Sequence, residues 1–176
     1  MIKQVKDQVM MQAFNHIWQT CWTEKGFEFE ENPFAEYFLF EQDGVPCGAF
    51  QLCDVSKLPL DENSVYLSHE TIKQHPEQVI EIDKLSILKE YRGSTILSQL
   101  FLFMMKYAEQ NDKRYFVALC EPMLYVSIID LYNVPVEKLG EPFYYKGDYV
   151  VPIIVDLVQA KNHFKQKTHT KSVLIT

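Results

Sequence analysis

The chain has 176 residues, of which 47% are hydrophobic and 23% charged, with 6 Gly and 8 Pro. This length suits one domain with its own core, and the composition excludes disordered, collagen-like and low-complexity proteins. The 24 acidic residues outnumber the 17 Lys and Arg, so the net charge is −7. An acidic chain disfavours nucleic-acid binding, because phosphate affinity comes from clustered Lys and Arg. We expect a domain over residues 1–159 and a basic C-terminal tail over residues 160–176, which hold four lysines and no acid.

Neither a membrane span nor a secretory signal is expected. The most apolar stretches, 96–105 and 149–158, are interrupted and far shorter than the ~20 residues that cross a bilayer. The N-terminus lacks the apolar core of a signal peptide. The four cysteines contain no Cys-x-x-Cys pair, and the histidines have no metal-ligand spacing. We therefore expect a cytoplasmic protein with reduced thiols and no metal site.

The first elements in the chain are a helix and a hairpin. Residues 3–22 carry apolar side chains at helical spacing, which predicts an amphipathic helix packed on a core, and the chain breaks near Gly26. Residues 37–52 contain two apolar runs around Asp43-Gly44, which predicts two antiparallel strands joined by a tight turn.

The middle of the chain predicts a loop and then a bulged strand. Residues 54–77 are polar and interrupted by proline, so we expect a loop with a short helix. Residues 79–88 alternate apolar and polar side chains, which is typical of a strand. The alternation slips by one residue between Ile82 and Leu85, which indicates a β-bulge.

The second half predicts two helices between strands. Helical spacing covers residues 96–108, a short buried strand follows at 115–120, and a helix runs from Pro122 to about residue 131. Two last strands are expected near 136–145 and 149–157. This order predicts a mixed α/β domain with one sheet covered by helices.

Sequence order and chemistry converge at the turn between the bulged strand and the helix that follows. A strand-to-helix turn directs several backbone N–H groups outward, which makes an anion site. Here Arg92 adds a positive charge, Gly93 allows close approach, and Ser94 and Thr95 add hydroxyl donors. The alternative is a plain connection in which Ser94 caps the helix. No Rossmann or P-loop glycine pattern is present.

The segment from Glu81 to Ser94 resembles the acyl-CoA-binding segment of the GNAT acyltransferase superfamily. In that family a strand leads into a turn with the pattern [Q/R]-x-x-G-x-[G/A], whose amides hold the pyrophosphate of coenzyme A. Arg92 matches the first position, whereas Thr95 and Leu97 replace the usual small residues. The resemblance implies a mostly antiparallel sheet with splayed central strands, and acetyl-CoA or a longer acyl-CoA as donor. It also implies these donor-binding residues: Leu85, Ser86, Ile87, Arg92, Gly93, Ser94, Thr95 and Ile96.

Within the superfamily, the chain is most similar to the acyl-homoserine-lactone synthases and the long-chain N-acyl amino acid synthases. Glu81-x-x-Lys84-Leu85 is similar to their Glu-x-x-Arg strand, and the segment 131–142 is similar to their late Pro- and Gly-containing segment. Asn32, Ala35 and Gln51 stand where these synthases carry Asp, Asp and Arg. The resemblance therefore implies acyl transfer, from acyl-CoA or acyl carrier protein to an amine, and argues against homoserine-lactone synthesis.

Two residues are candidates for the catalytic proton transfers. An amine that attacks a thioester must lose a proton, and Glu81 is our candidate base, with a backbone N–H of the strand near residues 85–87 holding the oxyanion. The alternative for Glu81 is a solvated carboxylate at a strand end. The family's usual acid is a Tyr whose position is occupied here by Ile129. Tyr125 and Tyr132 are nearby but out of register, and Tyr125 is our candidate acid.

Other functions and roles remain open from the sequence. The fold could serve as a non-catalytic acyl-CoA-binding or sensing module, or Cys120 could be the nucleophile of a hydrolase, although a buried structural Cys is far commoner. Phe103, Met104 and Met105 are most simply core residues, and their alternative role is to line an acyl groove.

Overall fold

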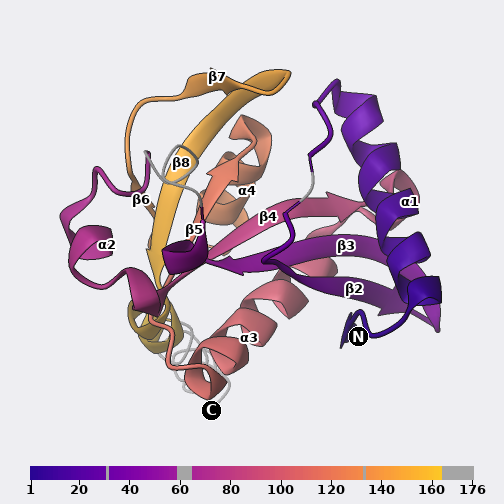
Figure 1. Ribbon diagram of the computed structural model, residues 1–176, viewed down its shortest axis with the longest axis horizontal. Coiled ribbons are helices and arrows are strands. Elements are labelled where there is room, and N and C mark those ends of the chain that lie inside the picture. The colour runs from indigo at the N-terminus through magenta and orange to yellow at the C-terminus, as the bar shows by residue number, and fades with distance from the viewer. Residues whose placement is uncertain (31, 59–64, 133, 164–176) are drawn as a thin grey trace, which may run out of the picture.

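Eight strands form one sheet in the computed structural model, in the spatial order β1-β2-β3-β4-β5-β8-β6, with β7 also paired to β8 (Figure 1). The structure describes residues 1–30, 32–58, 65–132 and 134–163, with only the backbone for residues 94, 95, 131 and 132. Neighbouring strands are antiparallel except for β4 and β5, which are parallel. The strands are β1 (Ile2–Gln4), β2 (Glu36–Gln42), β3 (Val45–Asp54), β4 (Val79–Ile87), β5 (Tyr115–Cys120), β6 (Glu137–Lys138), β7 (Phe143–Tyr145) and β8 (Asp148–Asp156).

Helices cover both faces of this sheet. The labelled ones are α1 (Gln8–Lys25), α2 (Glu70–Gln74), α3 (Ser94–Gln110) and α4 (Pro122–Tyr132). Helix α1 begins where Asp7 accepts a hydrogen bond from the backbone N–H of Met10, and it ends at Gly26 in the left-handed conformation. Helices α3 and α4 pack on one face, and α1 and the segment around α2 pack on the other. The mixed α/β fold with one mostly antiparallel sheet is confirmed.

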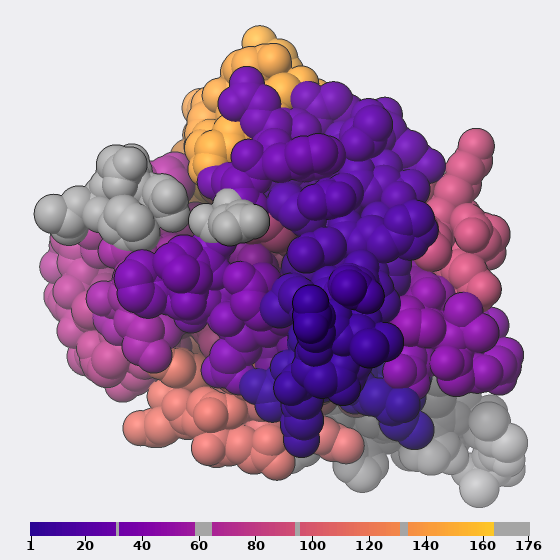
Figure 2. Space-filling model, turned by 45° about the vertical axis from the view of Figure 1, so that its right-hand side comes forward, coloured from indigo at the N-terminus to yellow at the C-terminus, as the bar shows by residue number. Residues whose placement is uncertain are grey.

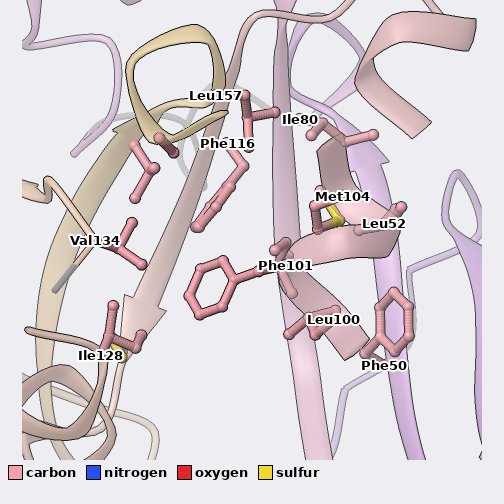
Figure 3. Close-up of a cluster of buried hydrophobic side chains, with 14 of the residues drawn as sticks. Phe50, Leu52, Ile80, Leu100, Phe101, Met104, Phe116, Ile128, Val134 and Leu157 are labelled. Atoms are coloured by element: carbon pink, nitrogen blue, oxygen red, sulfur yellow. The ribbon is translucent and has the colours of Figure 1, made fainter. Parts of the chain in front are cut away.

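The two faces of the sheet differ in how their cores are built. One continuous cluster lies under α3, where alternate residues of the strands, such as Phe50 and Leu52, meet Phe101 and Met104 (Figure 3). The other face carries two separate clusters. The first packs α1 on β2 and β3, and its buried residues are Phe14, Ile17, Trp18, Leu39 and Ala49. The second packs Tyr66 and Ile72 on β4, β5 and β8, and its buried residues are Cys53, Val55, Leu58, Tyr66, Ile72, Val79, Val117 and Ile154.

Strands β4 and β5 separate part-way along the sheet. They pair only from Val79 to Glu81 on β4, while β4 continues beside β3 to Ile87 and β5 continues beside β8 to Cys120. The β3–β4 register also shifts, because three residues of β4 span the distance that two residues of β3 cover. Lys84 lies in this bulge with a φ of 53°. The bulge predicted between Ile82 and Leu85 is confirmed, and so are the splayed central strands.

Two element predictions need correction. The helix predicted over residues 3–22 begins only at Gln8, because Ile2–Gln4 forms strand β1 and pairs with Phe38–Phe40 of β2. The strand predicted near 136–145 is two short strands, β6 and β7, and the segment that contains Gly140 and Pro142 separates them. Proline has no N–H to donate to a ladder, so pairing stops there.

The C-terminal part of the described chain remains packed on the domain. Residues 157–163 are helical, and Leu157 and Ala160 are buried in the cluster beneath α3. The rest of the predicted tail, residues 164–176, lies outside the described residues. In the part of the chain that the structure describes, no helix is both long and apolar enough to cross a membrane.

Candidate functional site

A cavity of about 470 Å³ lies where β4 and β5 separate. Its size is within the range of ~300–1,000 Å³ that is typical of small-molecule sites. Residues from both faces of the sheet line it, so the cavity passes between the strands and connects the two faces. Its apolar end lies under α3 and α4, and the lining residues that define it there are Leu97, Leu100, Phe101, Met104, Phe116, Leu124, Ile128 and Ile153.

Most of the predicted donor-binding segment lies along this cavity. Leu85, Ser86 and Ile87 line it from β4, and Arg92 and Gly93 line it from the following turn. Ile96 does not, because its side chain is buried in the core under α3. The side chains of Ser94 and Thr95 lie outside the described part of the structure. Gly93 occupies the N-cap of α3 without a side-chain cap, so the first N–H groups of the helix face the turn.

The positive charges at the cavity mouth are already paired with acids. A guanidinium nitrogen of Arg92 lies 2.7 Å from Glu24, and its Nε donates to the backbone carbonyl of Ile87 at 2.9 Å. Across the mouth, the ammonium of Lys25 lies 2.6 Å from Glu121. Both pairs are partly exposed. Such surface pairs contribute little to stability and can exchange partners when an anion arrives.

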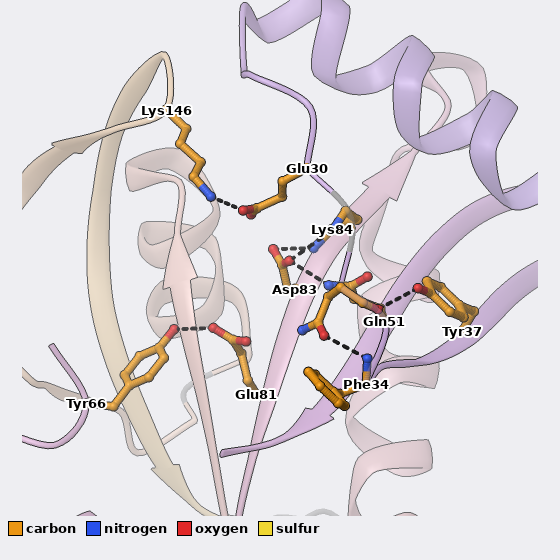
Figure 4. A network of polar contacts seen from close by, with 10 residues as sticks. Glu30, Phe34, Tyr37, Gln51, Tyr66, Glu81, Asp83, Lys84 and Lys146 are labelled. Atoms are coloured by element: carbon orange, nitrogen blue, oxygen red, sulfur yellow. Dashed lines mark hydrogen bonds and ion pairs between the residues drawn. The ribbon is translucent and has the colours of Figure 1, made fainter. Parts of the chain in front are cut away.

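A carboxylate–tyrosine pair lies on the face of the sheet opposite α3, where Tyr66 belongs to the core cluster around Ile72 (Figure 4). The hydroxyl of Tyr66 donates to Oε1 of Glu81 over 2.8 Å. Tyr66 is completely buried, and burial, followed by the charge of Glu81, raises the pKa of Tyr66 well above its ordinary value. The hydroxyl therefore stays protonated and holds the carboxylate. Glu81 is half-buried in the interior of β4 rather than at a solvated strand end.

Asp83 extends this polar group toward the cavity, which it lines although Glu81 does not. Its Oδ2 accepts from Nε2 of Gln51 at 2.8 Å, and its Oδ1 accepts from the backbone N–H of Lys84 at 2.6 Å. The side chain of Lys84 is buried and also lines the cavity. Glu81, Asp83 and Lys84 thus place two carboxylates and one ammonium beside the gap between the strands.

An arch formed by two distant segments closes this side of the molecule. The backbone N–H of Glu28 donates to the carbonyl of Lys146 at 2.8 Å, and the ammonium of Lys146 pairs with Glu30. Figure 2 shows the β7–β8 hairpin resting on the segment after α1. Gly147 has a φ of 119°, and a Cβ there would lie 2.2 Å from the carbonyl oxygen of Gly26, so only glycine fits. Burial lowers the pKa of Lys146, and the charge of Glu28 opposes that shift.

The remaining candidates differ in where they lie. Tyr125 is half-buried on α4 but does not line the cavity, and Lys138 lies over its ring. Met104 lines the apolar end, whereas Phe103 and Met105 do not. Cys120 does line the cavity, but burial raises the pKa of its thiol to about 12. A protonated thiol is a poor nucleophile, which disfavours the hydrolase alternative.

The family of the chain follows from its sequence. Residues 7–132 match the model of the acetyltransferase (GNAT) family. The chain belongs to the GNAT family. No curated protein matches it by sequence.

Within the described residues, no cluster of three His, Cys, Asp or Glu side chains could hold a metal ion.

Solved structures of acyl synthases share this GNAT fold over nearly the whole chain. FeeM, an N-acyl amino acid synthase from uncultured soil microbes, superposes with a TM-score of 0.73 at 14% identity and covers 92% of each chain. The acyl-homoserine-lactone synthase LasI gives a TM-score of 0.70 at 14% identity over 89% of each chain. A putative N-acetyltransferase from Lactobacillus plantarum gives 0.63 at 17% identity, over 89% of this chain and 97% of that one. These superpositions show that the chain shares the GNAT fold of proteins of the kind that the sequence motifs resembled.

The residues that surround the two carboxylates are not apparent from the sequence. Tyr66 lies in a stretch predicted as polar loop. Glu30 and Lys146 are far apart in the sequence, and only the fold brings them together in the arch. In the sequence, Lys84 stands out only as the replacement for an Arg. The predicted bulge was a signal for Lys84, because a bulge next to a cavity redirects a side chain.

Proposed function

We propose that this GNAT protein is an N-acyltransferase that moves an acyl group from acyl-CoA, or from an acyl carrier protein, to the amine of a small molecule or peptide. The observation that carries the proposal is the cavity between β4 and β5. It joins an apolar chamber under α3 to the polar side of β4, where Glu81 and Asp83 lie. A thioester held in this gap presents its carbonyl carbon to an amine on the polar side.

The apolar end of the cavity suits the acyl chain. Phe101 and Met104 contribute buried apolar surface there, and a chain longer than acetyl would reach them. The phosphates of coenzyme A would lie at the turn before α3, held by open backbone N–H groups and by Arg92 once it releases Glu24. Acetyl-CoA fits the same path but leaves the apolar end unfilled, so we expect longer acyl groups to bind more tightly.

Transfer would proceed by direct attack without a covalent enzyme intermediate. The amine nitrogen forms a bond to the thioester carbonyl carbon and passes one proton to Glu81 through a water molecule, because Glu81 itself does not line the cavity. Tyr66 holds the carboxylate during this step. A backbone N–H of β4 near Leu85 donates to the oxyanion, and the carbon–sulfur bond then breaks.

In the GNAT family a tyrosine usually protonates the leaving thiolate, and this proposal uses water for that step instead. The thiolate takes up a proton from water at the cavity mouth, and Glu81 returns its proton to solvent. Tyr125 remains our candidate acid only if its side chain rotates toward the cavity, because its hydroxyl is not among the groups that line it. We also infer a cytoplasmic location, which is supported by four buried, free cysteines.

The test is a thiol-release assay with acyl-CoA of several chain lengths and a panel of amines, with the amide product measured by mass spectrometry. Equal amounts of amide and free coenzyme A are expected, with a lower KM for longer chains. Tight acyl-CoA binding without turnover for every amine would instead favour the non-catalytic binding module. Coenzyme A release that yields only free acid would indicate a hydrolase.

A further inference from the structure

The bulge of β4 places a buried lysine beside the gap between the strands (Figure 4). Lys84 and Leu85 together lie opposite Phe50 of β3, so two residues of β4 face one residue of its neighbour. Lys84 has a φ of 53°, and its side chain is only 2% exposed although the residue lines the cavity. A residue with a Cβ keeps this left-handed conformation inside a strand only when its surroundings require it, which is common at functional sites.

The partners of the Lys84 ammonium compensate its charge only in part. Nζ lies 3.5 Å from Oδ2 of Asp83, a long contact, and that oxygen also accepts from Nε2 of Gln51. The rings of Trp18 and Trp22 are the other neighbours, with centroids 5.2 and 5.7 Å from Nζ. An ammonium has three donors, and aromatic faces attract its charge less strongly than a carboxylate does. The ammonium can therefore stabilise a further negative charge.

A second donor lies two residues further along β4. Ser86 is 3% exposed and lines the same cavity as Lys84. Among the groups that the structure describes, its Oγ has no hydrogen-bond partner. Buried hydroxyls without a partner are rare in native proteins, and they often have a role in a site. Lys84 and Ser86 thus supply two donors to the part of the cavity where β4 and β5 separate.

We propose that Lys84 is a catalytic residue whose ammonium stabilises the oxyanion formed during acyl transfer, with the hydroxyl of Ser86 as a second donor. This inference rests on the proposed function. When the amine nitrogen bonds to the thioester carbon, the π electrons of the carbonyl move to its oxygen, which gains a negative charge next to the ammonium. They return to the carbonyl as the carbon–sulfur bond breaks. Lys84 keeps its proton throughout, and the proton of the amine goes to Glu81.

The contribution of Lys84 is expected in the transition state and not in binding. A neutral thioester oxygen attracts an ammonium weakly, whereas an oxyanion beside a buried ammonium is attracted strongly. An interaction that strengthens only as the reaction proceeds raises kcat without tightening the binding of substrate. The phosphates of the donor do not compete for this charge, because in the proposed function they lie at the turn near Arg92.

Kinetics separates this role from donor binding. Lys84→Met should lower kcat by about 100-fold for every amine that is acylated, with the KM values of donor and amine almost unchanged. Lys84→Arg keeps a cation and should restore part of this loss. Ser86→Ala removes a neutral donor and should lower kcat by about tenfold. Lys3→Met, which removes an ion-paired lysine on β1, is the control and should leave kcat unchanged.

Two unreactive analogues of acyl-CoA test the charge without turnover. In the thioether analogue a CH₂ group replaces the carbonyl, and in the phosphonyl analogue a tetrahedral phosphorus with an anionic oxygen replaces it. Calorimetry should show that the wild type binds the phosphonyl analogue roughly tenfold or more tightly than the thioether, through charge-assisted hydrogen bonds. Lys84→Met should lose this preference and keep its affinity for the thioether.

The outcomes separate this inference from the proposed function. Amide formation at the wild-type rate in Lys84→Met overturns the inference and leaves the acyltransferase standing. Equal affinity of the wild type for the two analogues also overturns it, and this measurement holds even if the variant does not fold. Weaker binding of the thioether to a folded Lys84→Met protein would overturn it as well, because Lys84 would then bind the donor. If the wild type acylates no amine, the proposed function fails, and the catalytic role of Lys84 fails with it.

Discussion

The two charged regions of the cavity differ in how firmly their side chains are held. At the mouth, Arg92 and Lys25 pair with Glu24 and Glu121 on the surface, where each partner is at least a quarter exposed. On the polar side of β4, Tyr66 and Lys84 are almost completely buried, whereas their partners Glu81 and Asp83 are partly buried.

This difference assigns distinct roles to the two regions. Exposed ion pairs are screened by solvent and break at little cost in free energy, so Arg92 and Lys25 can exchange their acidic partners for the phosphates of a donor. Buried polar groups cannot rearrange without leaving a charge or a donor uncompensated. For the proposed reaction, we therefore expect the interior to fix the geometry and the mouth to tune affinity for the donor.

The largest effect is expected at Glu81. Glu81→Gln removes the proposed base and should lower kcat by ~10²-fold or more, with little change in affinity for acyl-CoA. Asp83→Asn is the matched variant, because Asp83 lies closer to the cavity but is held by Gln51 and by the backbone of Lys84. Steady-state kinetics from pH 6 to 9 would assign the base to Asp83 if only the second variant lost kcat.

The next effect concerns the mouth. Arg92→Glu should weaken binding of acyl-CoA by about 2 kcal/mol, through lost charge-assisted bonds and added repulsion. Glu24→Gln should do the opposite, because it releases Arg92 from its acidic partner. Calorimetry measures both, and a folded Arg92→Glu protein with unchanged affinity would place the phosphates elsewhere.

Tyr66→Phe tests whether the interior positions the base. The variant removes the hydrogen bond to Glu81, which should lower kcat about tenfold and the free energy of unfolding by about 2 kcal/mol. Since the pKa of Tyr66 is raised, the wild-type hydroxyl stays protonated, and its titration should not limit activity near neutral pH. Tyr125→Phe is the comparison, and a loss of kcat there would show that its hydroxyl reaches the leaving thiolate.

The smallest effect is expected at Cys120. With a pKa of about 12, this thiol is almost entirely protonated at pH 8, so alkylation of the native protein should be slow and should not change turnover. Mass spectrometry of native and denatured protein after iodoacetamide treatment measures the difference. Rapid inactivation together with labelling of Cys120 would revive the thiol-dependent hydrolase.

The regular elements were predictable because local sequence determines them. The Asp43-Gly44 turn specifies the β2–β3 hairpin, and Pro122 marks the start of α4, as the structure confirms. Strand β1 was missed because its three residues precede a strong helical pattern and become a strand only by pairing with β2. Short edge strands depend on a partner that the local sequence does not reveal.

The site was less predictable, because its residues meet only in three dimensions. The predicted donor segment is nearly contiguous, and five of its six residues whose side chains the structure describes line the cavity. Tyr66 reaches Glu81 through packing of a loop around Ile72, and no periodic pattern indicates that packing. Whether the side chain of Tyr125 reaches the cavity depends on how α4 is rotated about its axis. The family motif does not specify this rotation, because Tyr125 is out of register with it.

The most direct measurement is a crystal structure of the protein with a thioether analogue of a long-chain acyl-CoA, which cannot transfer its acyl group. The account predicts that the acyl chain passes between β4 and β5 and ends beside Phe101 and Met104, with the pyrophosphate at the turn after Arg92 and the reacting carbon facing Glu81. An acyl chain that lies outside the gap between these strands and leaves the cavity unfilled would contradict it.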